Sequence, residues 1–418
     1  MVKEQSNKER TASALKPKRA IAISGGGPTL GIAIGALEAL QQKGIHFNVY
    51  SCACIGSWVA CIYLSKDGAE SKTGIEHLKK VYRESFRPDD VYAGYPFAYF
   101  FQPDIWRYTL AAVEKLCAPD PYNNLFLPSR CMEFFQKWLQ RPILGINDLR
   151  AWFNDFLPVF PWTRLAVALI YKSSISGIVN QPNADALAAG KIDFDILKNA
   201  IPTIYTNAYN FKKYDVEMFT NRVSHKHPVT GERYKPISAE NLMAGSSLPF
   251  IYEPRCINGK WYCEGATVDT VNFKSLLENH PDLDEVWVVK IVDYKQIAKP
   301  NNLVEGISLL PMIFADTAAD DDIKLFRYHL LEEGKFDLNY EMFEYGADKM
   351  SKEYKEKMKD TLWKSCSLAD KIKKIKVVNI RVKYEDVNFD WNQANLERGI
   401  KAGKEAAEHS IETYLNYP

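Results

Sequence analysis

The hydrophobic and polar positions near the start of the chain alternate between short apolar runs and helical patterns. RAIAIS, from Arg19, is an apolar run typical of a buried strand, and a glycine turn, SGGG, follows it. The helical pattern after this turn is carried by Leu30, Ile34, Leu37 and Leu40. HFNVYSCACIGSWVACIYLS then repeats the order of strand, sharp turn and helix. Two successive βα units predict a largely parallel sheet.

Strand patterns return in the second half of the chain, at Ile201–Asn210, Tyr214–Thr220, Val286–Asp293 and Lys376–Val382. The stretch Met312–Asp370 is charged and helical in pattern. The chain closes with a predicted helix over Ala394–Tyr414. The sheet is therefore expected to be completed by strands from late in the sequence.

The segment between these two groups of strands is rich in aromatic residues. Residues 86–171 contain 20 Phe, Trp or Tyr in 86 positions, about 23% against 13% for the whole chain, which marks an inserted helical segment. The aromatic residues are either the ordinary core of a helical subdomain, or part of a cap that covers an acyl-chain pocket or docks on a lipid interface. The expected organisation is a flexible arm (1–18), a first core part (19–85), an inserted helical cap (86–200) and a second core part with C-terminal helices (201–418).

Charge and cysteine content exclude several classes of protein. Lys and Arg number 53 and Asp and Glu 52, so the formal charge of +1 provides no field that would attract nucleic acid. Eight Cys without ligand spacing indicate reduced thiols rather than a disulfide scaffold or a zinc site. Residues 1–18 lack the apolar region of a secretory signal, and charged residues and prolines interrupt the most apolar stretch, Trp152–Tyr171. We expect a cytoplasmic protein without a cofactor or a metal, with peripheral membrane contact through residues 86–171 as an alternative.

Ser24-Gly25-Gly26-Gly27 lies between a predicted strand and a predicted helix. Successive backbone N–H groups at such a turn can point at one anionic oxygen. A dinucleotide fingerprint would need glycine where Leu30 stands, and a P-loop would need Gly-Lys-Ser/Thr, which is missing. An oxyanion hole and a turn selected only for packing are the remaining interpretations.

The second turn, Cys52-Ala53-Cys54-Ile55-Gly56-Ser57, occupies the position of a nucleophile elbow, with Cys54 as the exposed central residue. A third segment, which runs from Asn258 to Asp269, places Glu264 between a strand and a glycine turn, at a sheet edge. Two other interpretations of Cys54 stay open: a small buried core residue, and one half of a strained redox pair with Cys52.

Taken in this order, the three motifs resemble those of the patatin-like phospholipases, and Met243–Phe250 resembles that family's small-residue helix that leads into a proline. The resemblance implies a three-layer αβα fold with a mostly parallel central sheet. It also implies oxyanion donors at Gly25, Gly26 and Gly27, a nucleophile at Cys54 and a carboxylate partner at Glu264.

The chain departs from the family pattern at each chemically active position. Thr29 and Leu30 replace a basic residue and a glycine, Cys52 replaces the first elbow glycine, Cys54 replaces serine and Glu264 replaces aspartate. A thiol at a helix N-terminus is expected to ionise readily, so that Glu264 need only orient it or shuttle a proton.

Thiolates attack thioesters readily but open oxygen esters poorly. The expected function is therefore acyl transfer from, or hydrolysis of, fatty or polyketide acyl thioesters, with coenzyme A or an acyl carrier protein as the donor. A lipid acyl hydrolase of the ordinary family type and a catalytically silent lipid-binding protein are the alternatives.

Two further clusters are not expected to hold a metal. His225 and His227 lie in a polar loop without a third ligand, and Asp316 and Asp320–Asp322 lack the spacing of a calcium loop. The acidic run is interpreted as a solvated helix start or loop.

Overall fold

The computed structural model of the chain describes residues 17–86, 105–117, 128–140, 145–157, 159–160, 162–163, 176–177, 179, 183–225, 231–274, 276–300, 303–346, 374–382 and 387–417. The chain divides into a larger unit, residues 1–101, 182–248 and 254–418, and a smaller unit, residues 102–181 and 249–253. The smaller unit is thus narrower than the insertion expected over 86–200. Of the expected N-terminal arm, 1–16 lie outside the described residues, while the Lys18 amide donates a hydrogen bond to Asp284 Oδ2 at 2.7 Å.

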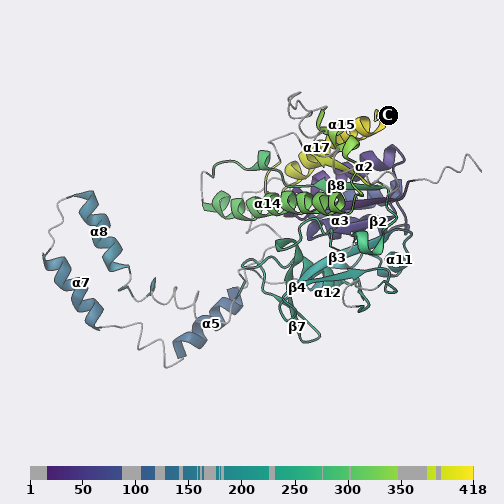
Figure 1. The fold of residues 1–418 in the computed structure, drawn as a ribbon. Coiled ribbons are helices and arrows are strands. Elements are labelled where there is room, and N and C mark those ends of the chain that lie inside the picture. The colour runs from purple at the N-terminus through teal and green to yellow at the C-terminus, as the bar shows by residue number, and fades with distance from the viewer. Residues whose placement is uncertain are drawn as a thin grey trace, which may run out of the picture. The chain divides into compact units, whose positions relative to one another are not determined.

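In the described residues, a nine-stranded sheet forms the centre of the larger unit, with the order β5-β4-β3-β2-β1-β8-β9 and a β6-β7 hairpin attached to β3. Figure 1 shows several of these strands side by side between the helices. The strands are β1 Arg19–Ile23, β2 Val49–Cys52, β3 Thr203–Asn210, β4 Asp215–Thr220, β5 Lys235–Pro236, β6 Arg255–Ile257, β7 Lys260–Glu264, β8 Glu285–Lys290 and β9 Lys376–Arg381. Among these strands, five pairings are parallel and three are antiparallel, namely β3 with β4, β3 with β7 and β6 with β7. The expected mostly parallel sheet, completed late in the chain, is confirmed.

One face of the sheet packs against the helices that follow the first two strands and against the last helix. These helices are α2 Gly31–Gln42, α3 Ile55–Leu64, α4 Lys72–Ser85 and α17 Gln393–Leu415. Trp287 of β8 is fully buried on this face and packs edge to face against Tyr414 of α17, with 5.1 Å between ring centroids. The helix expected over Ala394–Tyr414 therefore exists and covers the sheet.

Glycines allow α2 and α17 to approach until their backbones touch. A β-carbon built at Gly403 would overlap the Ile32 carbonyl oxygen, and one built at Gly35 would overlap the Ile400 carbonyl oxygen. Side chains at these positions would therefore hold the two helices apart.

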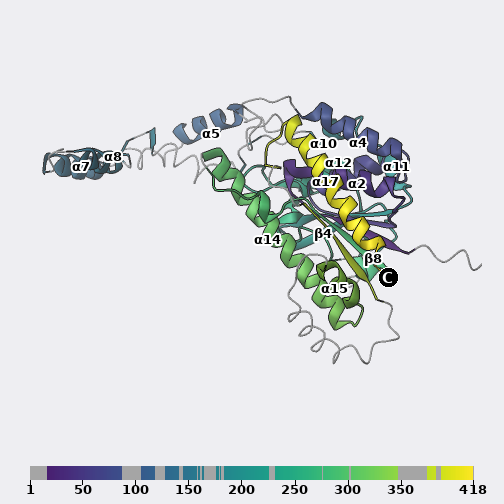
Figure 2. The same ribbon diagram turned by 90° about the horizontal axis from the view of Figure 1, so that it is seen from above.

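The opposite face of the sheet is covered by α13 Leu276–Asn279 and by the 30-residue helix α14 Leu303–Glu332. Ala20 and Val288 of the sheet share one buried cluster with Ile323 of α14. Phe273 stacks on Phe326 of α14 with 4.2 Å between ring centroids. Figure 2 shows α14 on one side of the strands and α2 and α17 on the other. The expected three-layer αβα architecture is confirmed.

The charged stretch Met312–Asp370 folds as the greater part of α14 and as α15 Leu338–Gly346, and its remainder, 347–370, lies outside the described residues. Shorter helices join the strands: α10 Ala184–Ala188, α11 Phe194–Lys198 and α12 Ala239–Gly245, with 3-10 turns η1 Gly27–Leu30, η3 Gly265–Thr267 and η4 Tyr294–Gln296.

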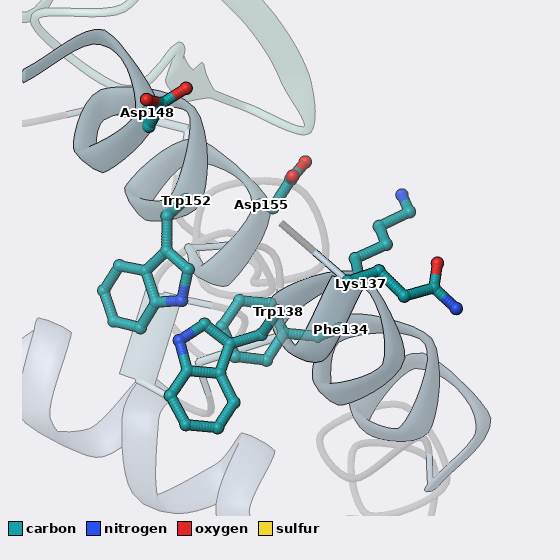
Figure 3. A pocket seen from close by; sticks show the side chains of 7 residues that line it. Phe134, Lys137, Trp138, Asp148, Trp152 and Asp155 are labelled. Atoms are coloured by element: carbon teal, nitrogen blue, oxygen red, sulfur yellow. The ribbon is translucent and has the colours of Figure 1, made fainter. Parts of the chain in front are cut away.

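The described part of the smaller unit contains α5 Ile105–Cys117, α7 Pro128–Gln140 and α8 Ile146–Phe156. Aromatic contacts join α7 to α8: Phe134 is 8% exposed and lies 5.7 Å, centroid to centroid, from Trp152, which stacks on Phe156. Figure 3 shows a pocket between these two helices, with Trp138 and Trp152 on its aromatic side and Lys137, Asp148 and Asp155 among its polar groups. Part of the aromatic block is thus the core of this unit. None of the helices, in the part of the chain that is described, is long and apolar enough to cross a membrane.

Candidate active site

Cys54 occupies a sharp turn between the end of β2 and the start of α3. Its backbone angles are φ 48° and ψ −124°, a conformation that a residue with a β-carbon rarely adopts. Such strain persists only where the surrounding structure enforces it, and it is the geometry of a nucleophile elbow. The Ile55 N–H, at the start of α3, is near the Cys54 sulfur and acts to lower the pKa of the thiol. The elbow expected from the sequence is therefore present in the backbone.

The sheet register brings Glu264 to this elbow. Along one edge of β3, the pairing with β2 ends at Cys52, which lies opposite Thr206. The other edge of β3 pairs with β4. β7 continues along the edge that β2 leaves, antiparallel to β3, with Glu264 opposite Ala208. Since β7 runs toward the end of β2, its last residue, Glu264, meets the turn that follows Cys52.

The Cys54 and Glu264 side chains are neighbours, and each shifts the pKa of the other. Glu264 is only 6% exposed, whereas Cys54 is partly exposed. Burial raises the pKa of the Glu264 carboxyl to about 7. Burial, and then the neighbouring Glu264 charge, raise the pKa of the Cys54 thiol well above its usual value.

The expectation of a readily ionised thiol is therefore wrong for this structure. Desolvation and the adjacent carboxylate outweigh the helix N-terminus, because both disfavour the thiolate. A carboxyl group with a pKa of about 7 beside a protonated thiol is suited to take its proton near neutral pH.

The glycine turn lies against this pair. A β-carbon built at Gly25 would lie 3.1 Å from the Cys54 β-carbon and 3.9 Å from Glu264 Oε1, so any side chain there would crowd both groups. The Gly25 N–H already donates a hydrogen bond to the Thr270 carbonyl oxygen at 3.2 Å. The N–H groups of Gly26 and Gly27 make no hydrogen bond within the described ranges. In this conformation Gly26 and Gly27 can donate to an oxyanion, whereas Gly25 would first have to leave Thr270.

The turn after Glu264 is fixed to the sheet and to α14. Asn207 Nδ2 donates to the Asp269 carbonyl oxygen at 2.9 Å, and Asn272 Nδ2 donates to the Cys52 carbonyl oxygen at 3.0 Å. The Thr270 N–H donates to Asp322 Oδ2 at 2.7 Å. These contacts hold the position of Glu264 relative to the elbow.

Ser246, just after α12, acts to lower the pKa of the Cys54 thiol, a role that the sequence does not predict. Its hydroxyl accepts a hydrogen bond from Trp58 Nε1 at 3.0 Å and donates to the Leu242 carbonyl oxygen at 3.0 Å. In the sequence, Ser246 lies in the small-residue stretch Met243–Phe250, and this pattern does not identify Cys54 as its neighbour.

The other clusters play structural parts. Within α14, Asp316 and Asp320 are ion-paired, because both accept hydrogen bonds at 2.6 Å from the Lys290 ammonium, whose side chain is 2% exposed. His225 Nδ1 lies 2.6 Å from the Tyr205 hydroxyl, and His227 lies outside the described residues. Across the described ranges, no group of three or more His, Cys, Asp or Glu side chains could hold a metal ion.

Cys52 and Cys54 are both free thiols in this structure. Burial raises the pKa of the Cys52 thiol well above its usual value. The structure therefore contains no disulfide between the two elbow cysteines.

Comparison with known proteins identifies the family. Solved structures with partial similarity include VipD from Legionella pneumophila (14% identity, TM-score 0.37, covering 96% of this chain and 68% of that one). Human GIVD cytosolic phospholipase A2, in complex with methyl γ-linolenyl fluorophosphonate and terbium chloride, is another (12% identity, TM-score 0.27), and the alignment covers 67% of this chain but only 41% of the human enzyme. Curated proteins give no match. The family model for patatin-like phospholipases matches residues 21–277, more than half of the chain and the stretch that contains the glycine turn, the elbow and Glu264, so this protein belongs to the patatin-like phospholipase family.

Proposed function

We propose that this protein is an acyl-transfer enzyme that uses Cys54 as its nucleophile and Glu264 as its general base. The observation that carries the proposal is that these two side chains meet at a strained elbow: a β-carbon built at Gly25 would lie 3.1 Å from the Cys54 β-carbon and 3.9 Å from Glu264 Oε1. Membership of a lipid hydrolase and esterase family supports an acyl substrate. The proposed substrates are fatty or polyketide acyl thioesters, delivered by coenzyme A or an acyl carrier protein in the cytoplasm, where thiols stay reduced.

The reaction has two proton-coupled halves. Glu264 takes the proton from the Cys54 sulfur, which attacks the carbonyl carbon of the thioester and forms a new C–S bond. The N–H groups of Gly26, Gly27 and Ile55 are the candidates to stabilise the oxyanion. The donor's C–S bond then breaks, and the departing thiolate receives the proton from Glu264. In the second half Glu264 takes a proton from water or an amine, which displaces Cys54, and the sulfur regains that proton.

The identity of the nucleophile favours a thioester over an oxygen ester. A thiolate is a better leaving group than an alkoxide, so the tetrahedral intermediate formed from an oxygen ester returns to reactants. With a thioester, the donor thiolate and the Cys54 thiolate are leaving groups of similar quality, so the intermediate can proceed to the acyl-enzyme. The step from acyl-enzyme to product then depends on activation of the acceptor by Glu264.

Intact-mass spectrometry after mixing with an acyl thioester tests the proposal. The expected result is an acyl adduct in the native protein and none in the Cys54→Ala variant. Cys263→Ala is the matched control, because Cys263 is buried next to Glu264 but lies on β7 and not at the elbow. Hydrolysis of a phospholipid or a nitrophenyl ester without a Cys54 adduct would establish the ordinary lipid hydrolase instead. If the protein forms no adduct and hydrolyses no ester, the remaining interpretation is a catalytically silent lipid-binding protein.

We also propose that the smaller unit touches a lipid interface. Exposed apolar side chains recur along its helices, at Trp106, Leu110, Val113, Met132, Phe135, Trp138, Leu139, Ile146, Leu149 and Phe153. Lys137 and Arg150 are exposed on the same helices and would suit anionic headgroups.

Vesicle binding tests this contact. Tryptophan emission should shift to the blue on addition of vesicles that contain phosphatidylglycerol, and Leu139→Glu should weaken the shift. Leu415→Glu is the control, because Leu415 is also largely exposed but lies on α17 of the larger unit. Equal binding by both variants and the native protein would rule out this surface.

A further inference from the structure

Two neighbouring turns of the larger unit present aromatic side chains to solvent. One turn follows β3, and the other joins β6 to β7. Their exposed aromatic residues are Tyr214 (82% exposed), Trp261 (54%) and Phe211 (41%). The Phe211 N–H donates a hydrogen bond to the Trp261 carbonyl oxygen at 3.1 Å, so the two turns lie side by side. We call residues 211–214 and 258–261 the hairpin patch.

The backbone of the hairpin patch is fixed by its own turns. Asn258 and Gly259, between β6 and β7, have φ values of 51° and 73°, which is the conformation of a tight two-residue hairpin turn. Tyr214 has φ 54°, and its N–H donates to the Asn210 carbonyl oxygen at 2.9 Å. A residue with a β-carbon rarely adopts this conformation, and an exposed ring adds no burial energy to the fold. Folding therefore does not explain why these turns carry aromatic residues.

The hairpin patch is also positively charged. Its charged residues are Lys212, Lys213 and Lys260. Lys213 Nζ lies 2.8 Å from Glu232 Oε2, and Asp215, which follows the patch, pairs with Lys274. Within the described ranges, Lys212 and Lys260 form no ion pair. Two positive charges without acidic partners therefore accompany the three aromatic rings.

The hairpin patch lies on the side of the sheet where the elbow is. β2 and β3 are parallel, with Cys52 opposite Thr206, but β3 continues to Asn210. At about 3.3 Å per residue, the turn after β3 extends roughly 13 Å beyond the end of β2. In Figure 1, the β7 hairpin lies at the lower end of the larger unit, away from α2 and α17. β7 leads from the patch back to Glu264, so a surface that touches the patch would lie close to the Cys54–Glu264 pair.

We propose that the hairpin patch docks the larger unit on an anionic lipid surface. Tryptophan and tyrosine are enriched at membrane interfaces, because each ring has an apolar body and a polar group. Lysines beside them are attracted to anionic headgroups. Turns that project from the sheet can reach a flat surface without any rearrangement. The inference does not rest on the proposed acyl transfer, since it concerns where the larger unit binds.

Sedimentation of the full chain with vesicles tests the role of charge. Vesicles of phosphatidylcholine mixed with phosphatidylglycerol are compared with vesicles of phosphatidylcholine alone. Lys212→Gln combined with Lys260→Gln should weaken binding to the anionic vesicles roughly 30-fold, about fivefold for each lysine. Lys43→Gln combined with Lys401→Gln is the matched control, because both lysines are exposed in the larger unit but lie outside the patch. This control should bind as the native protein does.

Trp261→Ser tests the role of the aromatic rings. It should weaken binding to both kinds of vesicle several-fold, whereas Tyr328→Ser, at an exposed position of α14, should not. Each variant is also measured in the Leu139→Glu background, so that binding through the smaller unit does not hide the effect. Native affinity in either patch variant, or equal losses in a patch variant and its control, would overturn the inference.

Two further outcomes separate this surface from the other proposals. Native vesicle binding in the patch variants, with loss of acyl transfer from an acyl carrier protein alone, would assign the patch to an acidic protein partner and reject the lipid surface. Weakened vesicle binding in a protein that forms no acyl adduct would support the docking surface and reject the proposed acyl transfer. The two failures are therefore distinguishable.

Discussion

Cys54 and Glu264 form a pair in which the carboxylate, and not the helix, controls ionisation. The pKa of Glu264 is raised to about 7 by burial, and the pKa of the thiol is raised further by burial and by the Glu264 charge. Glu264 therefore loses its proton first as pH rises, and its carboxylate can then accept the proton of the thiol. If Cys54 is the nucleophile, as proposed, it still needs a base at this site.

A pH profile of acylation follows from this order. The single-turnover rate of Cys54 acylation should rise with pH, with a midpoint near 7, and then level off. Glu264→Gln should remove that midpoint and slow acylation at pH 7.5 by roughly 10²–10⁴-fold, the usual contribution of a general base. Stopped-flow release of the thiol product gives the rate. A Glu264→Gln profile that keeps the midpoint would assign it to another group.

The Cys54 side chain itself can be exchanged for a hydroxyl. Cys54→Ser should keep the fold but lose most thioester turnover, because a serine hydroxyl has a much higher pKa than a thiol and Thr29 supplies no charge to stabilise the oxyanion. Steady-state assays with a thioester and a nitrophenyl ester make the comparison. If Cys54→Ser hydrolyses the ester as an ordinary lipase does, the thioester specificity is refuted.

At the scale of elements, glycines determine the distance between helices α2 and α17, which belong to one layer over the sheet. Gly403→Ala places a methyl group against the Ile32 carbonyl oxygen, which is backbone and cannot rotate away. We expect a loss of about 1–3 kcal/mol in the free energy of unfolding, as for other overpacked cores. Urea denaturation measures it.

Gly306→Ala is the matched substitution in another helix. No atom of the described residues lies within 4 Å of a β-carbon built at Gly306 in α14, so alanine should stabilise the protein by up to about 1 kcal/mol through helix propensity alone. A stabilising Gly403→Ala, or equal effects of the two variants, would contradict close backbone packing of α2 and α17.

At the scale of the whole molecule, buried carboxyl groups make stability depend on pH. Glu264, Asp322 and Glu341 each have a pKa raised to about 7, chiefly by burial. The folded state then binds more protons than the unfolded state between the ordinary carboxyl pKa and pH 7, so these groups lower the free energy of unfolding as pH rises through that range. His280, whose pKa burial lowers to about 4, acts in the opposite direction.

The contribution of Glu264 can be isolated by difference. Relative to the native protein, Glu264→Gln should raise the free energy of unfolding at pH 8 by on the order of 2–3 kcal/mol, and should change it little at pH 4.5, where the native carboxyl is protonated. Glu76→Gln, at an exposed position of α4, should have no such effect. Urea titrations at the two pH values make the test. A Glu264→Gln difference that is equal at both values would show that ionisation of Glu264 does not cost stability.

The sequence alone determined the βα order, the glycine turn, the elbow at Cys54 and the acidic residue at Glu264. Hydrophobic periodicity and turn residues are local, so a single chain segment carries each of these signals. The helix over Ala394–Tyr414 was predictable for the same reason, within one residue at each end.

Only the tertiary structure decided how these parts act on one another. β7 takes the edge of β3 that β2 leaves, and this register, rather than any local pattern, puts Glu264 against Cys54. Desolvation there reversed the expected pKa shift of the thiol, and Thr270 bound the Gly25 amide. Each of these depends on which distant groups surround a side chain and exclude water from it, and a local pattern in the sequence does not contain that information.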